Sequence, residues 1–327
     1  MSSLSVTLVI PARDAAQTIG PCLDALLPLQ QNALLSEIIV VDDGSKDETA
    51  SIIKSYPVRY LEGAGRGAGS ARNLGWKQAQ SDLVWFVDSD CVAEAGALER
   101  LLPYMQDEKV GAVGGSYGNM NTHSLVASLI HEEIVERHLR MPNRVSFLAT
   151  FNILIRKKVL EQVGGFDERF LKAQDVELAY RIMEGGFTLA FDAESRVKHY
   201  HLTALLKYLK VQAKQGYWRI WLYKKHPKRA GGDSYAGKID YAQPPLAMCC
   251  LATLPLVVLS WWPLIVSAML LLLLQLPMAL ALISRTRKLR YLSYLPFGFI
   301  LAFWRGVGMS LAVLSLLLPS KQSVSVG

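Results

Sequence analysis

One long uncharged run constrains this chain of 327 residues more than any other feature. The 44 residues from Tyr241 to Ser284 contain no Asp, Glu, Lys, Arg or His. A membrane-spanning helix needs about 20 apolar residues, so the run is long enough for two helices. Trp261, Trp262 and Pro263 lie near its middle, where a turn between helices would hold aromatic rings at a membrane surface. The run therefore predicts a helical hairpin over 246–262 and 264–283.

A third apolar segment, 292–318, carries a single charge, Arg305. If this segment spans the membrane, the guanidinium lies near mid-bilayer, and Gly306 and Gly308 allow a neighbouring helix to pack closely. In the alternative, Arg305 reaches the headgroups and the segment lies in the interface. We expect a span, and so about three transmembrane helices within 241–320.

The basic residues set the expected orientation. The loop after the second span carries Arg285, Arg287, Lys288 and Arg290, and basic loops stay in the cytoplasm. This places residues 1–240 in the cytoplasm and residues 319–327 outside. We therefore expect a multi-pass protein of the inner, cytoplasmic membrane.

Charge is divided unevenly along the chain. Residues 1–194 carry 18 Lys/Arg and 26 Asp/Glu, whereas residues 195–327 carry 17 and 2. Ten of the basic residues and no acid fall within 196–229, where apolar residues recur at helical spacing. The segment 201–240 is thus predicted to hold a basic amphipathic helix on anionic membrane lipids, with a solvated helix covering the N-terminal domain as the alternative. No nucleic-acid-binding motif accompanies the charge, so nucleic acid is not an expected partner.

Residues 1–200 alternate strand and helix patterns. Strands are expected at 6–10, 37–41, 58–61, 83–87, 110–115, 147–155 and 187–191. Helices are expected at 15–27, 47–55, 68–79, 96–106, 123–140 and 175–184, with Ser45 and Glu48 as a capping box before the second helix. The alternation predicts an α/β domain with a mostly parallel sheet and helices on both faces. Ligands bind such sheets beyond the carboxyl ends of the strands.

Acidic residues follow several of these strands. Asp42 and Asp43 come after the second strand, and Asp88 and Asp90 come after the fourth. An Asp at a strand end is often only a turn former or a helix cap. Asp88 and Asp90, however, are separated by one residue, so both carboxylates can converge on a hard cation such as Mg²⁺.

A glycine-rich segment, 63–70, follows the third strand. It does not fit the dinucleotide-binding fingerprint, because Ser70 stands at the third glycine position. We interpret it as a flexible loop whose backbone approaches a phosphate, with Arg72 close enough to reach the same anion. Further on, Asp175 lies in the first turn of a predicted helix, where it is either a cap or an ionised general base.

Taken in order, these short motifs resemble glycosyltransferase family 2, whose members have the GT-A fold, over roughly residues 4–200. The resemblance is carried by Val9-Ile10-Pro11-Ala12-Arg13, Val41-Asp42-Asp43-Gly44-Ser45, Ala71-Arg72-Asn73, Asp88-Ser89-Asp90, Gly164-Gly165-Phe166-Asp167-Glu168 and Gln174-Asp175. It implies inverting transfer of a sugar from a nucleotide-diphospho-sugar, carrying UDP, GDP or dTDP.

The resemblance also implies roles for donor-binding residues. Pro11, Arg13 and Asp42 would line the pocket for the base. Arg72 would lie near the nucleotide, and Asp88 would contact the ribose or the sugar.

The remaining implied roles concern the metal and the chemistry. Asp90, with Asp88, would hold Mg²⁺ or Mn²⁺ against the diphosphate, and His199 is a further candidate near the metal. Asp175 would deprotonate the acceptor hydroxyl.

Two departures from the family pattern shape the expected function. Gln174 replaces the usual acid before Asp175, and the Q-x-x-R-W motif of sugar polymerases is altered at Gln215–Arg219, where Trp and Arg are exchanged. We therefore expect transfer of a single sugar to a lipid-linked or cell-envelope glycan acceptor at the cytoplasmic membrane face. Two alternatives remain: transfer to a polyisoprenyl phosphate, which needs no general base, and a catalytically inactive membrane scaffold.

The four cysteines show no paired spacing. Cys22, Cys91, Cys249 and Cys250 therefore predict neither a disulfide framework nor a zinc site. Reduced thiols in the cytoplasm fit this pattern.

Overall fold

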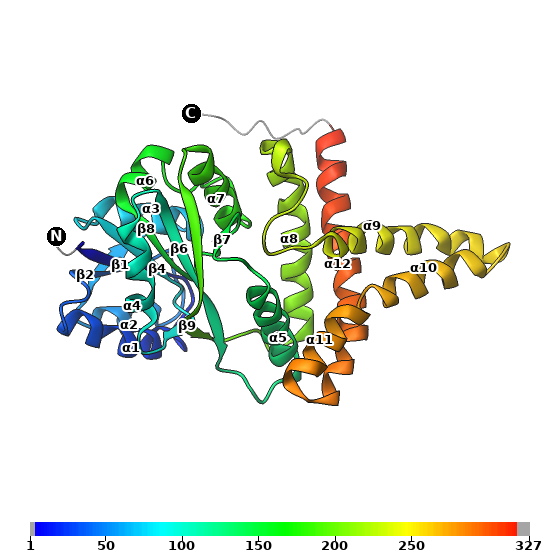
Figure 1. The fold of residues 1–327 in the computed structure, drawn as a ribbon, viewed down its shortest axis with the longest axis horizontal. Helices are drawn as coiled ribbons and strands as arrows, with labels where there is room; N and C mark the ends of the chain where they lie inside the picture. The colour runs from blue at the N-terminus through cyan, green and yellow to red at the C-terminus, as the bar shows by residue number, and fades with distance from the viewer. Residues whose placement is uncertain (1–3, 319–327) are drawn as a thin grey trace. The chain divides into compact units, whose positions relative to one another are not determined.

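The computed structural model describes residues 4–318, which form two compact units (Figure 1). One unit ends at His201 and the other begins at Leu202. Residues 319–327, which the sequence analysis expects outside the membrane, lie outside the described residues.

The N-terminal unit is built on one mixed sheet. Its strands are β1 (Val6–Ala12), β2 (Glu37–Asp42), β3 (Arg59–Glu62), β4 (Leu83–Val87), β5 (Cys91–Ala93), β6 (Val110–Asn119), β7 (Arg144–Val145), β8 (Asn152–Arg156) and β9 (Thr188–His199). Among the described residues their order is β3-β2-β1-β4-β8-β6-β9-β5, with β7 paired to β9. The sheet is parallel from β3 to β4, whereas β8 runs antiparallel to both β4 and β6.

The parallel half positions the strand ends that the motifs occupy. Pro11 of β1 is in register with Val41 of β2, and Val9 is in register with Phe86 of β4. The carboxyl ends of β1, β2 and β4 therefore meet at one edge of the sheet. Apart from the half-buried Glu37, these strands are buried and almost continuously apolar, as expected for parallel strands covered on both faces.

Helices flank this sheet. They are α1 (Ile19–Gln31), α2 (Thr49–Lys54), α3 (Ala68–Gln78), α4 (Ala97–Leu101) with a 3₁₀ turn η1 (Leu102–Gln106), α5 (Leu125–Leu139), α6 (Lys157–Val163) and α7 (Gln174–Glu184). The predicted capping box is wrong. The Ser45 hydroxyl donates to Asp42 instead, and α2 begins at Thr49, whose N–H donates to Asp47 Oδ1 (3.0 Å).

The C-terminal unit is helical. It contains α8 (Leu205–Lys225), η2 (Pro227–Arg229), α9 (Lys238–Thr253), η3 (Leu254–Val258), α10 (Trp262–Leu273), α11 (Leu276–Thr286), η4 (Leu289–Ser293) and α12 (Tyr294–Leu317). Three stretches, Lys238–Val258, Trp262–Thr286 and Leu289–Leu317, are long and apolar enough to cross a membrane.

Close backbone contact joins α8 to α12. A Cβ on Gly308 would lie 1.9 Å from the carbonyl oxygen of Ala213, and a Cβ on Gly216 would lie 2.2 Å from that of Arg305. The expected close packing at Gly308 is therefore confirmed. The Arg305 side chain donates through Nε to Oε1 of Gln212 in α8 (2.5 Å).

Candidate active site

The glycine-rich loop after β3 is held by a buried carboxylate. Asp43, 2% exposed, accepts hydrogen bonds from the backbone N–H groups of Arg66 (3.1 Å) and Gly67 (2.7 Å). Gly65 and Gly67 have φ of +70° and +105°, which glycine adopts without steric cost. The glycines of this loop predict that its backbone approaches a phosphate. For these two N–H groups that prediction is wrong, because Asp43 already binds both.

Arg13 and Asp42 lie beside this loop at the ends of β1 and β2. Nη1 of Arg13 donates to the carbonyl of Gly65 (3.1 Å) and lies 3.7 Å from Oδ2 of Asp43. Asp42, 4% exposed, accepts from the Ser45 backbone (3.0 Å) and from the Tyr60 hydroxyl (3.3 Å). Arg13 and Asp42 thus form one polar group at the sheet edge, next to Pro11 at the end of β1.

Arg72 and Asp88 form a second group at the same edge. Arg72, on α3, is 3% exposed, and its Nη2 donates to Oδ1 of Asp88 (2.5 Å) just after β4. The guanidinium also lies over the ring of Phe166, 5.6 Å from its centroid. Within residues 4–318, Nε and Nη1 of Arg72 are buried and have no hydrogen-bond partner. The group thus contains two buried donors whose hydrogen-bonding capacity is not used within the described residues.

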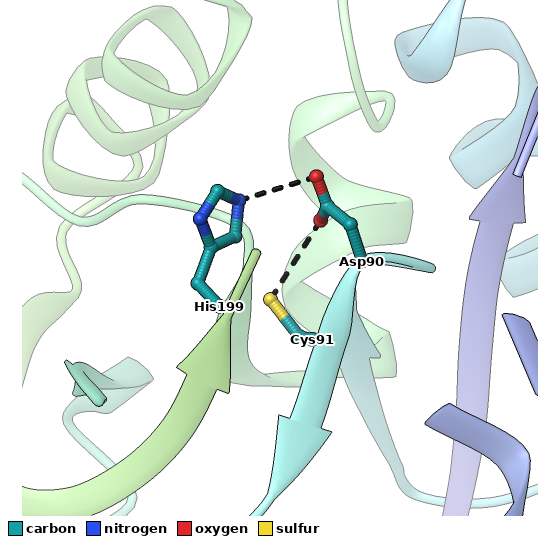
Figure 2. Close-up of side chains that lie close together, drawn as sticks. All are labelled: Asp90, Cys91 and His199. Carbon is teal, nitrogen blue, oxygen red and sulfur yellow. Dashed lines mark hydrogen bonds and ion pairs between the residues drawn. The ribbon is translucent and has the colours of Figure 1, made fainter. Parts of the chain in front are cut away.

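Asp90, two residues further on, meets His199 from the end of β9 (Figure 2). His199 Nε2 lies 3.2 Å from Asp90 Oδ2, and the Cys91 thiol donates to Oδ1 of the same carboxylate (3.8 Å). Burial alone would raise the pKa of Asp90, but the hydrogen bond and charge of His199 hold it below its usual value. Burial alone would lower the pKa of His199. The hydrogen bond to Asp90 and the charge of its carboxylate outweigh burial and raise that pKa.

The donor atoms of this cluster fit a divalent cation. One ligand atom each from Asp90, Cys91 and His199 lie within 4.8 Å of one another. Burial, followed by the charges of Asp90 and Asp88, raises the pKa of the Cys91 thiol, so it stays protonated. A carboxylate oxygen and an imidazole nitrogen remain, which suits Mn²⁺ or Mg²⁺ better than a metal that prefers thiolate.

His201 supports His199 from the other side of the ring. The two Nδ1 atoms are 3.1 Å apart, so one of them carries the shared proton. Burial and the neighbouring histidines His199 and His131 lower the pKa of His201 to about 2, so it is neutral. A partner at Nδ1 fixes the orientation of a ligating imidazole and leaves Nε2 for the metal.

Asn73 lies on α3, the helix that carries Arg72, and connects this helix to the loop around Phe166. Its amide nitrogen donates to the Phe166 carbonyl (2.8 Å) and to Glu168 (3.0 Å), and its oxygen accepts from the Phe166 N–H (2.8 Å) and from Trp76 (2.9 Å). Burial would raise the pKa of Glu168, but hydrogen bonds from Asn73 and Ser70 lower it. The loop that covers Arg72 is therefore fixed by one amide.

Asp175 lies in the first turn of α7, after Ala173 in a left-handed conformation (φ 58°). Its Oδ1 accepts from the N–H of Val176 (2.9 Å). The start of α7 packs against the start of α3, because a Cβ on Gly69 would lie 2.5 Å from Oε1 of Gln174. Asp175 thus belongs to a separate element that reaches the site through the first turn of α3.

The sequence motifs predict most of these residues, but three contributions are visible only in the structure. These are the carboxylate of Asp43, the amide of Asn73 and the imidazole of His201. The available signal for His201 was its position two residues after His199, just beyond the end of β9.

The comparisons with known proteins agree with this fold. Residues 7–164 match the sequence model described as "Glycosyl transferase family 2". The chain is 30% identical over 203 residues to a probable glycosyltransferase, YdaM, of Bacillus subtilis, covering 57% of this chain and 48% of that one. It is 27% identical over 212 residues to the O-antigen chain rhamnosyltransferase RfbN of Salmonella typhimurium, covering 61% and 67%.

The chain therefore spans about half to two thirds of the length of these relatives. Among solved structures, it resembles the mannosyltransferase PcManGT from Pyrobaculum calidifontis, a complex with GDP-Man and Mn²⁺. The TM-score is 0.60 at 20% identity, over 94% of this chain and 87% of that one, which shows a shared GT-A-like fold. Residues 7–164 thus match glycosyl transferase family 2, the family that the motifs of this segment resemble.

Proposed function

We propose that the protein is an inverting, metal-dependent glycosyltransferase that moves one sugar from a nucleotide-diphospho-sugar to a lipid-linked or cell-envelope glycan acceptor. It would act at the cytoplasmic face of the inner membrane. The observation that carries this proposal is the meeting of Arg72, Asp88, Asp90 and His199 beyond the carboxyl end of β4. The alternative of an inactive scaffold is disfavoured, because a scaffold has no use for buried, unpaired guanidinium donors.

The donor would lie across the two polar groups. Pro11, Arg13 and Asp42 line one end of the strand edge and would hold the nucleotide base. Nε and Nη1 of Arg72 would donate to diphosphate oxygens, since these buried donors otherwise have no partner among the described residues. Asp88 anchors the guanidinium and would contact the ribose or the sugar.

Asp90 and His199 would hold the divalent cation, with Asp88 nearby. When bound there, Mg²⁺ or Mn²⁺ neutralises charge that develops on the departing diphosphate. The GDP-Man and Mn²⁺ held by the mannosyltransferase of the same fold support this class of donor and of cation.

Asp175 would act as the general base. Its carboxylate accepts the proton of the acceptor hydroxyl as that oxygen attacks the anomeric carbon, while the bond from this carbon to the diphosphate breaks on the opposite face. Attack opposite to the leaving group inverts the anomeric configuration. The name of the rhamnosyltransferase relative, which acts on O-antigen, supports an envelope glycan as the acceptor class.

The test is a stability screen of the purified protein with UDP-, GDP- and dTDP-sugars in the presence of Mn²⁺. A donor at 100 times its dissociation constant stabilises the folded state by about 2.7 kcal/mol, which is measurable as a thermal shift. We expect one nucleotide class to stabilise the protein, and to do so only with a divalent cation. If no nucleotide sugar shifts the transition with or without metal, the proposal fails and the scaffold alternative is favoured.

A further inference from the structure

The apolar helices of the C-terminal unit are arranged crosswise. The hairpin formed by α9, η3 and α10 packs near its base on the middle of α12, where Ala247, Cys250 and Leu271 form a buried cluster with Ala302. Figure 1 shows the rest of the hairpin projecting to the side of α12, which runs beside α8. At the tip, Val258 is 88% exposed.

The hairpin is too short to cross a bilayer from this contact. Its outgoing arm runs from Ala247 to Val258 and its return arm from Trp262 to Leu271. At 1.5 Å per helical residue, each arm extends about 15 Å beyond α12. The hydrocarbon core of a bilayer is about 30 Å thick, so the tip reaches its middle from a base at the surface.

Contacts between α8 and α12 restrict the orientation of α12. The rings of Tyr208 and Phe297 stack 5.9 Å apart near one end, and the hydroxyl of Tyr217 lies 3.3 Å from that of Ser315 near the other. The two helices therefore run together over most of α12. If α12 stood upright in the bilayer, α8 would stand in it too.

The charges of α8 are incompatible with that position. Lys207, Lys210 and Lys214 are exposed, and residues 199–229 contain no acid to pair with them. Ammonium groups in the hydrocarbon core are costly, whereas the headgroups of an anionic leaflet attract them. The α8 side of the pair thus suits a charged membrane surface.

The exposed apolar residues of α12 and of the hairpin tip, in contrast, suit the hydrocarbon region of the membrane. Leu314 and Leu317 of α12 are 51% and 74% exposed, and Trp262 at the tip is 71% exposed. The backbone at the tip is hydrogen-bonded within itself: Leu259 and Ser260 donate to the Leu256 carbonyl (2.9 Å each). Such internal pairing is what the hydrocarbon region of a membrane requires.

We propose that α8 and α12 lie together in the plane of an anionic phospholipid surface, and that the α9–α10 hairpin enters this leaflet and returns without crossing the bilayer. Residue 318 then lies on the same side of the membrane as the basic loop at 285–290. This inference does not depend on the proposed reaction, because it rests on the C-terminal unit alone.

The first test is cysteine labelling with a membrane-impermeant maleimide in a Cys249→Ala background, which removes the exposed native thiol. Single cysteines are introduced as Ser260→Cys at the tip, Ser320→Cys, and Ser284→Cys beside the basic loop as a control. We expect Ser284→Cys and Ser320→Cys to react in inside-out vesicles and not in spheroplasts. Ser260→Cys should react from neither side, yet react with a lipid-soluble maleimide.

Three spans predict a different pattern, in which Ser260→Cys and Ser320→Cys both lie outside, opposite to Ser284→Cys, and both react in spheroplasts. Labelling of Ser260→Cys by the impermeant reagent from either side overturns the proposal, as does labelling of Ser320→Cys in spheroplasts.

A second test measures depth and needs no cysteine. Purified protein is reconstituted into anionic vesicles that contain lipids brominated either near the bilayer centre or near the headgroups. The fluorescence lost in a Trp261→Phe/Trp262→Phe variant reports the tip. We expect the central bromines to quench this component more strongly, and stronger quenching by the shallow bromines would contradict a re-entrant hairpin.

Discussion

Arg72 and Asp88 meet through a single nitrogen, which leaves Nε and Nη1 of the same buried guanidinium without partners in the described part of the chain. A buried donor without a partner costs about 1–3 kcal/mol. The ion pair therefore leaves the site incomplete, and an anion that accepts from both nitrogens would relieve this cost.

Replacing Arg72 with Lys should weaken binding of a nucleoside diphosphate and leave binding of the nucleoside unchanged. The ammonium keeps the charge beside Asp88, but it cannot reproduce the planar set of donors. We expect the diphosphate affinity to fall by about tenfold or more, the equivalent of about 1.4 kcal/mol per factor of ten, in calorimetric titrations. Arg59→Lys, on a surface ion pair with Glu37, is the matched control. Equal losses for nucleoside and diphosphate would contradict this role.

Asp90→Ala should abolish the dependence of nucleotide-sugar binding on Mn²⁺. The substitution removes the carboxylate that faces His199 and leaves a protonated thiol and one imidazole, too few ligands for a hard cation. The measurement is the thermal shift produced by the nucleotide sugar with Mn²⁺ and with chelator. Glu99→Ala, an exposed acid on α4, controls for the change in charge. If the Asp90→Ala variant kept full metal-dependent binding, Asp90 would not be a ligand of the metal.

Asp175→Asn should lower turnover and spare donor binding. Asn is nearly isosteric and its side-chain oxygen still accepts from the N–H of Val176, so the start of α7 stays intact. A positioned base contributes about 10²–10⁴-fold to the rate, and we expect a loss of that size in single-turnover assays. Glu184→Gln, at the other end of α7, serves as the control. A variant that turns over normally would favour a polyisoprenyl phosphate acceptor, which needs no base.

Asn73→Ala should destabilise the N-terminal unit. It removes four hydrogen bonds and leaves the N–H and the carbonyl of Phe166 without their side-chain partner. Each buried group left unsatisfied costs about 1–3 kcal/mol, and each kcal/mol lowers the melting temperature by about 2–4 °C for a unit of this size. Asn32→Ala, exposed at the end of α1, should change the melting temperature little. Equal melting temperatures for the two variants would disprove the bracing role of Asn73.

His138→Gln should make the protein less sensitive to acid. Burial, with the nearby charges of His131 and Arg137, lowers the pKa of His138 to about 3, whereas an unfolded His titrates near 6.5. Between these values the unfolded chain binds a proton that the folded chain does not, so stability is full above pH 6.5 and falls as the pH is lowered.

When the pH is lowered from 7.5 to 5.5, this single group should reduce the free energy of unfolding of the native protein by about 1.4 kcal/mol. The variant should not show this loss. Thermal unfolding of both proteins at the two pH values measures the difference. Parallel losses of stability in the two proteins would mean that His138 is protonated in the folded state.

The parallel half of the sheet could be predicted because its strands are continuous apolar runs bounded by turn residues. Val6–Ala12, Glu37–Asp42 and Leu83–Val87 each fit this pattern, and their ends carry the predicted site residues. Residues that follow neighbouring parallel strands share an edge whatever the rest of the fold does. For this reason the position of Asp42 and Asp88 at one edge of the sheet could be predicted from the sequence.

Short elements and pairings distant in the chain could not be predicted. Cys91–Ala93 is a strand because it pairs with β9, about a hundred residues away, and has no periodicity of its own. The extension of β9 to His199 depends on the same pairing and on a register shift beside Gly115 in β6. The proximity of His199 to Asp90 is a product of this pairing, so sequence spacing alone could only suggest it.

The carboxylate of Asp43 has a consequence for how a donor enters. The Asp43 carboxylate accepts hydrogen bonds from the N–H groups of Arg66 and Gly67. It therefore orders this loop in the way that a bound anion would otherwise do. Conformational entropy of this segment is then lost during folding and not during association. Donor capture should accordingly proceed as docking onto a finished surface, with an association rate that does not depend on loop closure, and Asp43→Asn should convert it into a slower, ordering-limited event.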